Sequence, residues 1–262
     1  ILAITNETLV YRNLDNQPDG GYYPRLAESW EMSSDGLTWD FYLREGIQWQ
    51  GGYGEFTAND VKFSLELAGR EGSVSSYASV FRPGGETVDS YNVISPYHLQ
   101  IKMKTSYALF LFNLSRYEMS IVSENYFNAV GYDVAKKHPI GTGPWKFVDY
   151  QPANYIKFEA VPNHWRQTPQ FQTLTVKAIP ELSAQLAMLK TGSADIAIIP
   201  AERITEMESA GLHIKQMPSA GWVALDFGGQ VLPSRPKYDP TCPWVSHQDE
   251  PASSDWNQRA LK

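Results

Sequence analysis

The sequence is poor in several features that mark whole classes of protein. Its 262 residues include a single cysteine, Cys242. One thiol rules out an intrachain disulfide and a zinc site built from cysteines. No Lys or Arg run is present, and the net charge of −7 argues against nucleic acid as a partner, because phosphate binding needs a basic surface. No apolar run approaches the roughly 18 residues that a membrane-spanning helix requires.

Catalytic signatures are missing as well. The five histidines show neither H-x-x-x-H nor H-E-x-x-H spacing, and no serine lies in a G-x-S-x-G turn. No phosphate-binding glycine loop occurs, since GTGPW carries Pro144 where such a loop needs free N–H groups. Four carboxylates have structural explanations, at a turn, a helix N-cap, a helix face and a strand start: Asp35, Asp60, Glu66 and Asp195. We therefore expect no enzyme, no metal site and no cofactor.

Aromatic residues, in contrast, are abundant, with 8 Trp, 15 Tyr and 11 Phe. Large hydrophobic cores and sheet faces are one interpretation. A recognition cleft lined by Trp and Tyr is the other, because these rings combine contact area with a polar atom. A hydrophobic content of 42% and a charged content of 19% are ordinary for globular proteins, and the length suits one large domain or two ordinary ones.

Residues 138–166, HPIGTGPWKFVDYQPANYIKFEAVPNHWR, predict a turn followed by a β-hairpin. Glycine tolerates positive φ and proline fixes φ, so the Gly and Pro residues at the start set one sharp backbone path. A strand begins at Trp145, a turn follows around Pro152, and the next run alternates, with Ile156 and Phe158 on one face. The hairpin is therefore expected to bury one face.

Three earlier stretches have equally local signals. Asp35-Gly36 is a tight-turn signal between two strand-like runs. Thr57 suits a helix N-cap, and Asp60, three residues later, suits the capping box of the helix that follows. Residues 98–104 alternate between apolar and polar side chains, as in a strand with one solvated face.

Residues 173–227 alternate between strand-like and helix-like patterns. The predicted order is strand 173–179, helix 181–190, strand 194–199, helix 201–209, and strands 212–217 and 222–227. This β-α-β-α-β order predicts a mainly parallel sheet with right-handed crossovers. The proline-rich stretch after Val231 predicts a long loop that leads out of the domain.

Together these motifs resemble the family 5 solute-binding proteins of ABC transporters, the extracytoplasmic receptors for oligopeptides, dipeptides and nickel. The segments that carry the resemblance are PRLAESWEMSSDGLTWDFYLREGIQW, FTANDVKFSLE, GTGPWKF with the later N-HW-R, and LKTGSADIA. They keep the family's order from Glu7 to about Asp226. The loop 50–55 is slightly longer than the family's turn, and Ala194 replaces its usual valine.

The resemblance implies an α/β fold of the periplasmic-binding-protein type. A mainly parallel sheet domain, residues 123–230 with 1–6, would carry a smaller strand-rich domain, residues 7–122, as an insertion. Residues 231–262 would be a loop and the start of a connection to a second lobe. Both ends of the sequence fall inside helix-like patterns, which suggests a fragment without that second lobe and without the family's first ligand-contacting strand.

The implied function is capture of a solute, with a peptide as the best candidate, and its delivery to the permease subunits of an ABC importer. The protein would be a monomer, either periplasmic or anchored by a lipid outside the cytoplasmic membrane. It would meet the membrane only through the permease or that anchor. The alternative is a sensory ligand-binding module of a regulatory protein with the same fold. A hydrolase is disfavoured by the missing catalytic groups.

Six residues match ligand-facing segments of the family: Tyr77, Arg116, Tyr117, Ile198, Ile199 and Trp222. Arg116 suits an acidic group or a peptide carboxylate, or is a solvated charge. Ile198 and Ile199 end a predicted parallel strand at the edge where open α/β sheets bind ligands, unless they are plain core. Tyr77 and Trp222 are either cleft aromatics or rings packed within their own domain.

Overall fold

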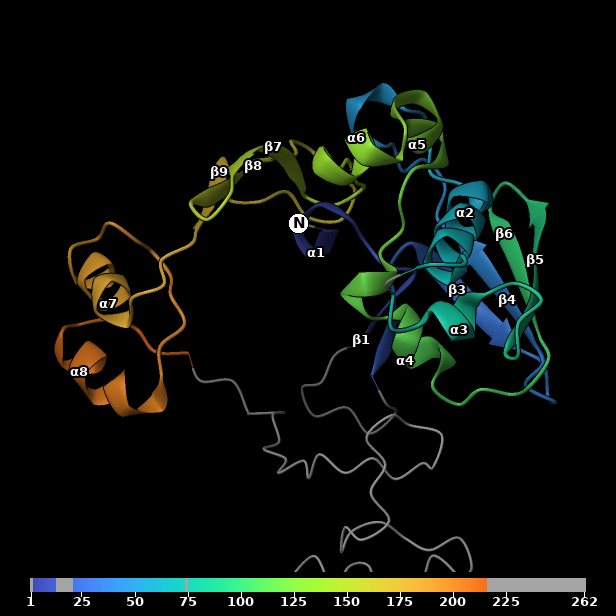
Figure 1. The fold of residues 1–262 in the computed structure, drawn as a ribbon, viewed down its shortest axis with the longest axis horizontal. Coiled ribbons are helices and arrows are strands. Elements are labelled where there is room, and N and C mark those ends of the chain that lie inside the picture. The colour runs from blue at the N-terminus through green and yellow to red at the C-terminus, as the bar shows by residue number, and fades with distance from the viewer. Residues whose placement is uncertain (1, 13–20, 74, 216–262) are drawn as a thin grey trace, which may run out of the picture. The chain divides into compact units, whose positions relative to one another are not determined.

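The structure is a computed structural model and describes residues 2–12, 21–73 and 75–215 (Figure 1). The chain divides into two compact units, Ile1–Gln185 and Leu186–Lys262, which are described separately. Within the described ranges, no helix is both long enough and apolar enough to cross a membrane.

A four-stranded antiparallel sheet forms the centre of the N-terminal part of the first unit (Figure 1). Its order is β3 (Ala27–Met32), β4 (Thr38–Leu43), β6 (His98–Met103) and β5 (Val88–Ser95). Alternate side chains face the core, where Phe41, Leu99 and Ile101 are fully buried. The predicted turn between β3 and β4 is confirmed, since Asp35 accepts a 2.9 Å hydrogen bond from the Leu37 N–H.

Helix α2 (Ala58–Gly69) packs on β5 and β6, and its predicted capping box is confirmed. The Asp60 carboxylate accepts from the Thr57 N–H at 2.9 Å. It also accepts from the Glu124 N–H at 2.9 Å and from the Trp49 indole at 3.3 Å. Glu124 begins α5 (Glu124–Val130), so one buried carboxylate joins the first turns of two helices. Burial raises the pKa of Asp60, and these hydrogen bonds oppose the shift.

The remaining elements of the first unit are short. They are α1 (Leu2–Thr5), β1 (Val10–Arg12), β2 (Tyr22–Pro24), the 3₁₀ turns Gln50–Gly52 and Tyr117–Met119, α3 (Ala78–Phe81), α4 (Phe110–Leu114) and α6 (Tyr132–Lys137). The helix-like pattern at the start of the sequence is wrong beyond Thr5, because Leu9 lies in a bend and Val10 begins β1, and both side chains are buried.

The predicted hairpin after the GTGP turn is confirmed. β7 (Trp145–Gln151) pairs antiparallel with β8 (Tyr155–Ala160), and Phe147 lies opposite Phe158. Both rings are buried, as the alternation predicts. β9 (Thr173–Lys177) adds a third antiparallel strand beside β8. No helix lies between β8 and β9 to provide the crossover that a parallel pair needs, so β9 runs back along β8.

The GTGP turn presses against the end of α1. The Gly143 N–H donates to the Thr5 carbonyl at 2.9 Å, and a Cβ on Gly141 would lie 1.8 Å from the same oxygen. Gln50 clamps the other side, donating to the Gly143 carbonyl at 3.1 Å and accepting from the Gly141 N–H at 3.2 Å. Neither glycine has positive φ, so close approach, rather than the φ freedom inferred from sequence, requires glycine here.

In the second unit the predicted helices form and the predicted strand does not. α7 (Leu182–Lys190) leads into this unit, and α8 (Ile204–Ser209) follows the 3₁₀ turn Ala201–Arg203. Gly192 and Gly211 have φ of +70° and +81°, the left-handed conformation expected after a helix end. Leu186 and Met207 are the buried apolar side chains among the described residues of the second unit.

The mainly parallel sheet is a wrong prediction for the described residues, because all their strand pairs are antiparallel. Residues 194–199 form no strand, and Ile196 and Ile198 are 88% and 93% exposed. A strand needs a hydrogen-bonding neighbour, which an apolar run in the sequence does not supply. The predicted strand 222–227 lies outside the described residues, as does the end of 212–217.

Replacing Gly141 with alanine should destabilise the protein by about 3 kcal/mol, because the new methyl group meets the Thr5 carbonyl. Gly72→Ala is the control. Its Cβ meets nothing within 4 Å, so only its positive φ of +73° adds a cost of about 1 kcal/mol. Urea unfolding of the two variants measures the difference, and equal losses would contradict the role given to close approach.

Asp60→Ala should lower the free energy of unfolding by about 2–4 kcal/mol. It removes a helix cap and leaves buried N–H donors of Trp49 and Glu124 without an acceptor. Ser123→Ala is the matched comparison, because Ser123 caps only α5 and should cost about 1 kcal/mol. Ligand affinity should stay unchanged in both. Thermal and urea melts showing no larger loss for Asp60→Ala would refute its double role.

Candidate functional site

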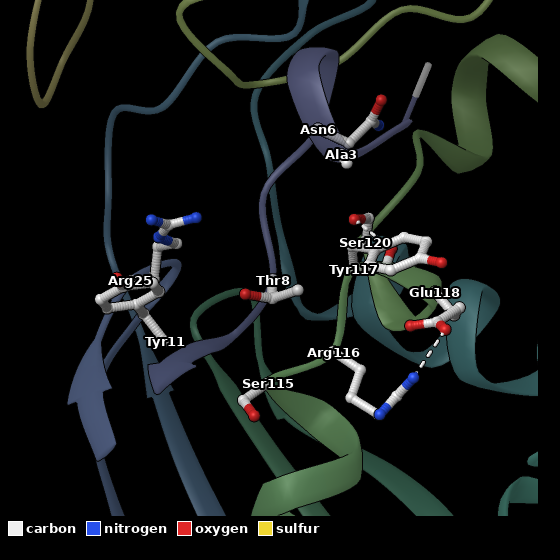
Figure 2. A pocket seen from close by; sticks show the side chains of 10 residues that line it. All are labelled: Ala3, Asn6, Thr8, Tyr11, Arg25, Ser115, Arg116, Tyr117, Glu118 and Ser120. Atoms are coloured by element: carbon white, nitrogen blue, oxygen red, sulfur yellow. Dashed lines mark hydrogen bonds and ion pairs between the residues drawn. The ribbon is translucent and has the colours of Figure 1, made fainter. Parts of the chain in front are cut away.

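An open pocket of about 340 Å³ lies in the first unit, beside the extended residues 6–8 that connect α1 to β1 (Figure 2). Its lining residues are Ala3, Asn6, Thr8, Tyr11, Arg25, Ser115, Arg116, Tyr117, Glu118 and Ser120. Figure 2 shows Arg25 and Tyr11 on one side of Thr8, with Arg116 and Tyr117 on the other. One wall thus comes from residues near the start of the chain, Tyr11 and Arg25, and the other from the distant segment with Arg116 and Tyr117.

Three of the six predicted site residues come together here. Arg116 and Tyr117 line the pocket, and the Arg116 guanidinium lies over the Tyr77 ring, 5.5 Å from its centroid. Tyr117 is 60% exposed and so is available for contact. Arg116 also pairs with Glu118 at 2.9 Å, and this hydrogen bond raises the pKa of Arg116. The charge of Arg116 is thus already balanced within the pocket wall.

The other three predicted residues are not among those that line this pocket. Ile198 and Ile199 belong to the second unit, where Ile198 is almost fully exposed. They do not lie at the edge of a strand, because residues 194–199 form none. Trp222 lies outside the described residues.

Sequence reasoning missed the opposite wall, Thr8, Tyr11 and Arg25. Arg25 follows Pro24 at the head of the LAESW motif, directly before the fully buried Leu26. A charged residue next to a buried stretch in the most specific motif was the available signal. The Arg25 carbonyl accepts a hydrogen bond from the Arg44 Nε at 2.7 Å, and the Arg25 guanidinium lies over the Tyr11 ring, 4.7 Å from its centroid.

The small polar side chains of the pocket donate their hydrogen bonds to backbone carbonyls of the protein. Asn6 donates both amide hydrogens to backbone carbonyls, at 2.8 and 3.1 Å. The hydroxyls of Thr8, Ser115 and Ser120 each donate to a backbone carbonyl at 2.6–2.7 Å. These groups can still accept hydrogen bonds, but they offer few donors to a ligand.

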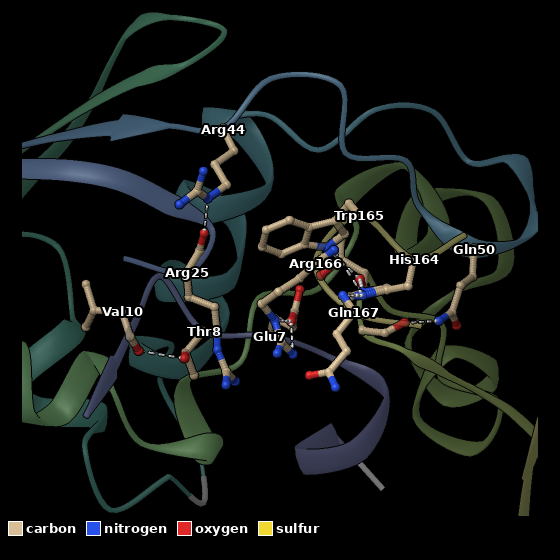
Figure 3. Close-up of polar contacts among 12 residues, drawn as sticks. Glu7, Thr8, Val10, Arg25, Arg44, Gln50, His164, Trp165, Arg166 and Gln167 are labelled. Atoms are coloured by element: carbon tan, nitrogen blue, oxygen red, sulfur yellow. Dashed lines mark hydrogen bonds and ion pairs between the residues drawn. The ribbon is translucent and has the colours of Figure 1, made fainter. Parts of the chain in front are cut away.

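A buried charge network lies next to the pocket (Figure 3). Glu7, 1% exposed, accepts two hydrogen bonds from Arg166 on the same oxygen, at 3.1 and 2.9 Å. The second Glu7 oxygen is buried and has no hydrogen-bond partner among the described residues. Behind the pair, His164 and Trp165 both bond the Thr142 carbonyl, at 2.9 and 3.1 Å, which fixes the segment that carries Arg166.

The groups that line the pocket are suited to binding. Within the described ranges, no three His, Cys, Asp or Glu side chains gather as metal ligands. The pocket combines two tyrosines, two arginines and one carboxylate, which suit contact with a polar organic molecule.

Comparison with known families identifies the fold. The model of "Bacterial extracellular solute-binding proteins, family 5 Middle" matches residues 21–237. The structure resembles the Campylobacter jejuni protein NikZ, solved in complex with Ni(L-His), with a TM-score of 0.69 and 28% identity over 79% of this chain and 40% of that one. The fold is therefore of the periplasmic-binding-protein type.

Two curated relatives agree with this match. Heme-binding protein A of Haemophilus influenzae is 28% identical, covering 68% of this chain and 35% of the relative. The dipeptide-binding protein of Escherichia coli is 26% identical, covering 80% of this chain and 43% of the relative. The chain thus spans less than half the length of these relatives.

Arg166→Gln should destabilise the protein by about 3 kcal/mol, because it leaves the buried Glu7 carboxylate unpaired. Glu7→Gln should cost about 1 kcal/mol, since Arg166 is 37% exposed and can turn towards water. The double variant should be more stable than Arg166→Gln alone. Urea unfolding of the four proteins gives the coupling free energy. Additive losses would show that the two side chains do not stabilise each other.

Proposed function

We propose that this chain, which belongs to family 5 of the bacterial extracellular solute-binding proteins, captures a solute outside the cytoplasmic membrane for import by an ABC transporter. The observation that supports capture is the open pocket, which Arg116 and Tyr117 line and which Tyr77 adjoins through Arg116. Permease subunits are its proposed partners.

A peptide is the proposed cargo. The pocket suits such a ligand because tyrosine rings can pack on aliphatic side chains while their hydroxyls meet peptide groups. The relative from Escherichia coli is itself a dipeptide-binding protein. The pocket's spare acceptors match the N–H groups that an extended peptide presents.

The proposed ligand-binding residues remain Tyr77, Arg116, Tyr117, Ile198, Ile199 and Trp222. We propose that Tyr117 packs against the ligand and that Arg116, held over Tyr77 and paired with Glu118, forms the rigid wall beside it. The division into an inserted domain, residues 7–122, and a sheet domain, residues 123–230 with 1–6, is also proposed. Its support is that the four-stranded and three-stranded sheets fall on either side of Val122.

The proposal predicts that the protein binds peptides and that Tyr117→Ala weakens this binding by about 1–3 kcal/mol, the scale of a lost aromatic anchor. Tyr150→Ala is the control, because Tyr150 is also partly exposed but is not among the residues that line the pocket. Isothermal titration with di- and tripeptides measures both variants. Mass spectrometry of ligand that co-purifies with the protein identifies the cargo directly.

Two results would count against this assignment. Equal loss of affinity in Tyr117→Ala and Tyr150→Ala would show that the pocket is not the binding surface. A co-purified ligand without peptide bonds, together with no heat of binding for any peptide, would refute the peptide cargo while leaving solute capture in place.

A further inference from the structure

The charges in and beside the pocket do not balance. Arg116 is paired with Glu118 at 2.9 Å, and Glu7 is paired with Arg166 at 2.9 Å. Among the residues that the structure describes, no carboxylate pairs with Arg25, which lines the same pocket. One positive charge is therefore left over on the pocket wall.

Arg25 is held in place without having its donors used. Its N–H donates to the Leu9 carbonyl at 3.2 Å, and its own carbonyl accepts from the Arg44 Nε at 2.7 Å. Its guanidinium rests on the Tyr11 ring, 4.7 Å from the centroid. The backbone contacts and the ring thus position the side chain, while no acceptor among the described residues takes a hydrogen bond from its guanidinium.

The surroundings of Arg25 disfavour its positive charge on balance. The pKa of Arg25 is lowered by its partial burial and by the nearby Arg166, while the nearby Glu7 and Tyr11 oppose this shift, and arginine stays charged at any ordinary pH. The side chains of Asn6 and Thr8 donate to backbone carbonyls. Arg116 has a buried Nε without a hydrogen-bond partner among the described residues, but its charge is balanced by Glu118. Arg25 is therefore the cation of the pocket wall with which no carboxylate of the described residues forms an ion pair.

We propose that Arg25 is the anion-binding residue of the pocket, and that the ligand presents a carboxylate to its guanidinium. The planar fork of arginine matches the two oxygens of a carboxylate in paired hydrogen bonds. Arg116 does not take this role, because its charge is already balanced by the Glu118 carboxylate. The inference rests on the proposed solute capture and adds a requirement, namely that the cargo be anionic at the Arg25 end of the pocket.

The test compares trialanine with trialanine amide, which differ only in the terminal carboxylate. Isothermal titration of the protein, freed of bound ligand by unfolding and refolding, should show tighter binding of the carboxylate form. Arg25→Gln should weaken that form by about tenfold to a hundredfold and remove the preference over the amide. Arg25→Lys should keep part of the preference, because it keeps the charge and loses the fork.

Arg70→Gln is the matched control, since Arg70 also rests on a tyrosine ring, that of Tyr132 at 4.3 Å, but does not line the pocket. It should bind both peptides as the unaltered protein does. Equal binding of the two forms by the unaltered protein, or a preference that survives Arg25→Gln, would overturn the proposal and leave solute capture standing.

A second measurement needs no peptide. Sodium sulfate should raise the melting temperature of the protein and of Arg70→Gln more than sodium chloride does at the same ionic strength. Arg25→Gln should show a smaller rise, because it lacks the site where the anion binds the folded state. If trialanine binds in neither form, the peptide cargo is refuted and sulfate alone decides. An unchanged sulfate response in Arg25→Gln overturns the anion site in either case.

Discussion

The contact between the GTGP turn and the Thr5 carbonyl holds the end of α1, from which the chain enters the candidate site at Asn6 and Thr8. The turn can approach the Thr5 carbonyl this closely only where its residues have no Cβ, and Gly141 and Gly143 meet that condition. The turn fixes the end of α1, so Asn6 reaches two backbone carbonyls far along the chain. The next residue, Glu7, pairs with Arg166, and Thr8 lines the pocket.

Local chemistry was readable from the sequence. The capping box at Thr57 and Asp60 and the hairpin after Trp145 depend on residues a few positions apart, and both predictions are confirmed. The parallel sheet was not readable in this way. Residues 194–199 have the composition of a buried strand, but pairing depends on a neighbour that is distant in the sequence, and these residues form no strand. An apolar run predicts burial only when its partner is known.

The candidate site shows the same division. Resemblance selected Arg116 and Tyr117, which share the pocket, and Tyr77, which adjoins it through Arg116. It could not show that Glu118 neutralises Arg116, because that pairing depends on the 3₁₀ turn that brings the two side chains to one side. Nor did it select Arg25. The charge beside the buried Leu26 was a sequence signal, but the lack of a carboxylate partner among the described residues depends on contacts between segments that are distant in the sequence.

Pairing therefore decides which charge in this region can act on a ligand. The Glu7–Arg166 pair is nearly sealed from water on the carboxylate side, so separating it would leave a buried carboxylate unpaired. The Arg116–Glu118 pair is more exposed and easier to open, yet its guanidinium is also held by the rings of Tyr77 and Phe112. Arg25 lies against the Tyr11 ring, and its guanidinium forms no ion pair with the described residues, so an incoming anion breaks no such pair there. Preorganisation of this kind lowers the cost of binding, because the protein has ordered the side chain before the ligand arrives.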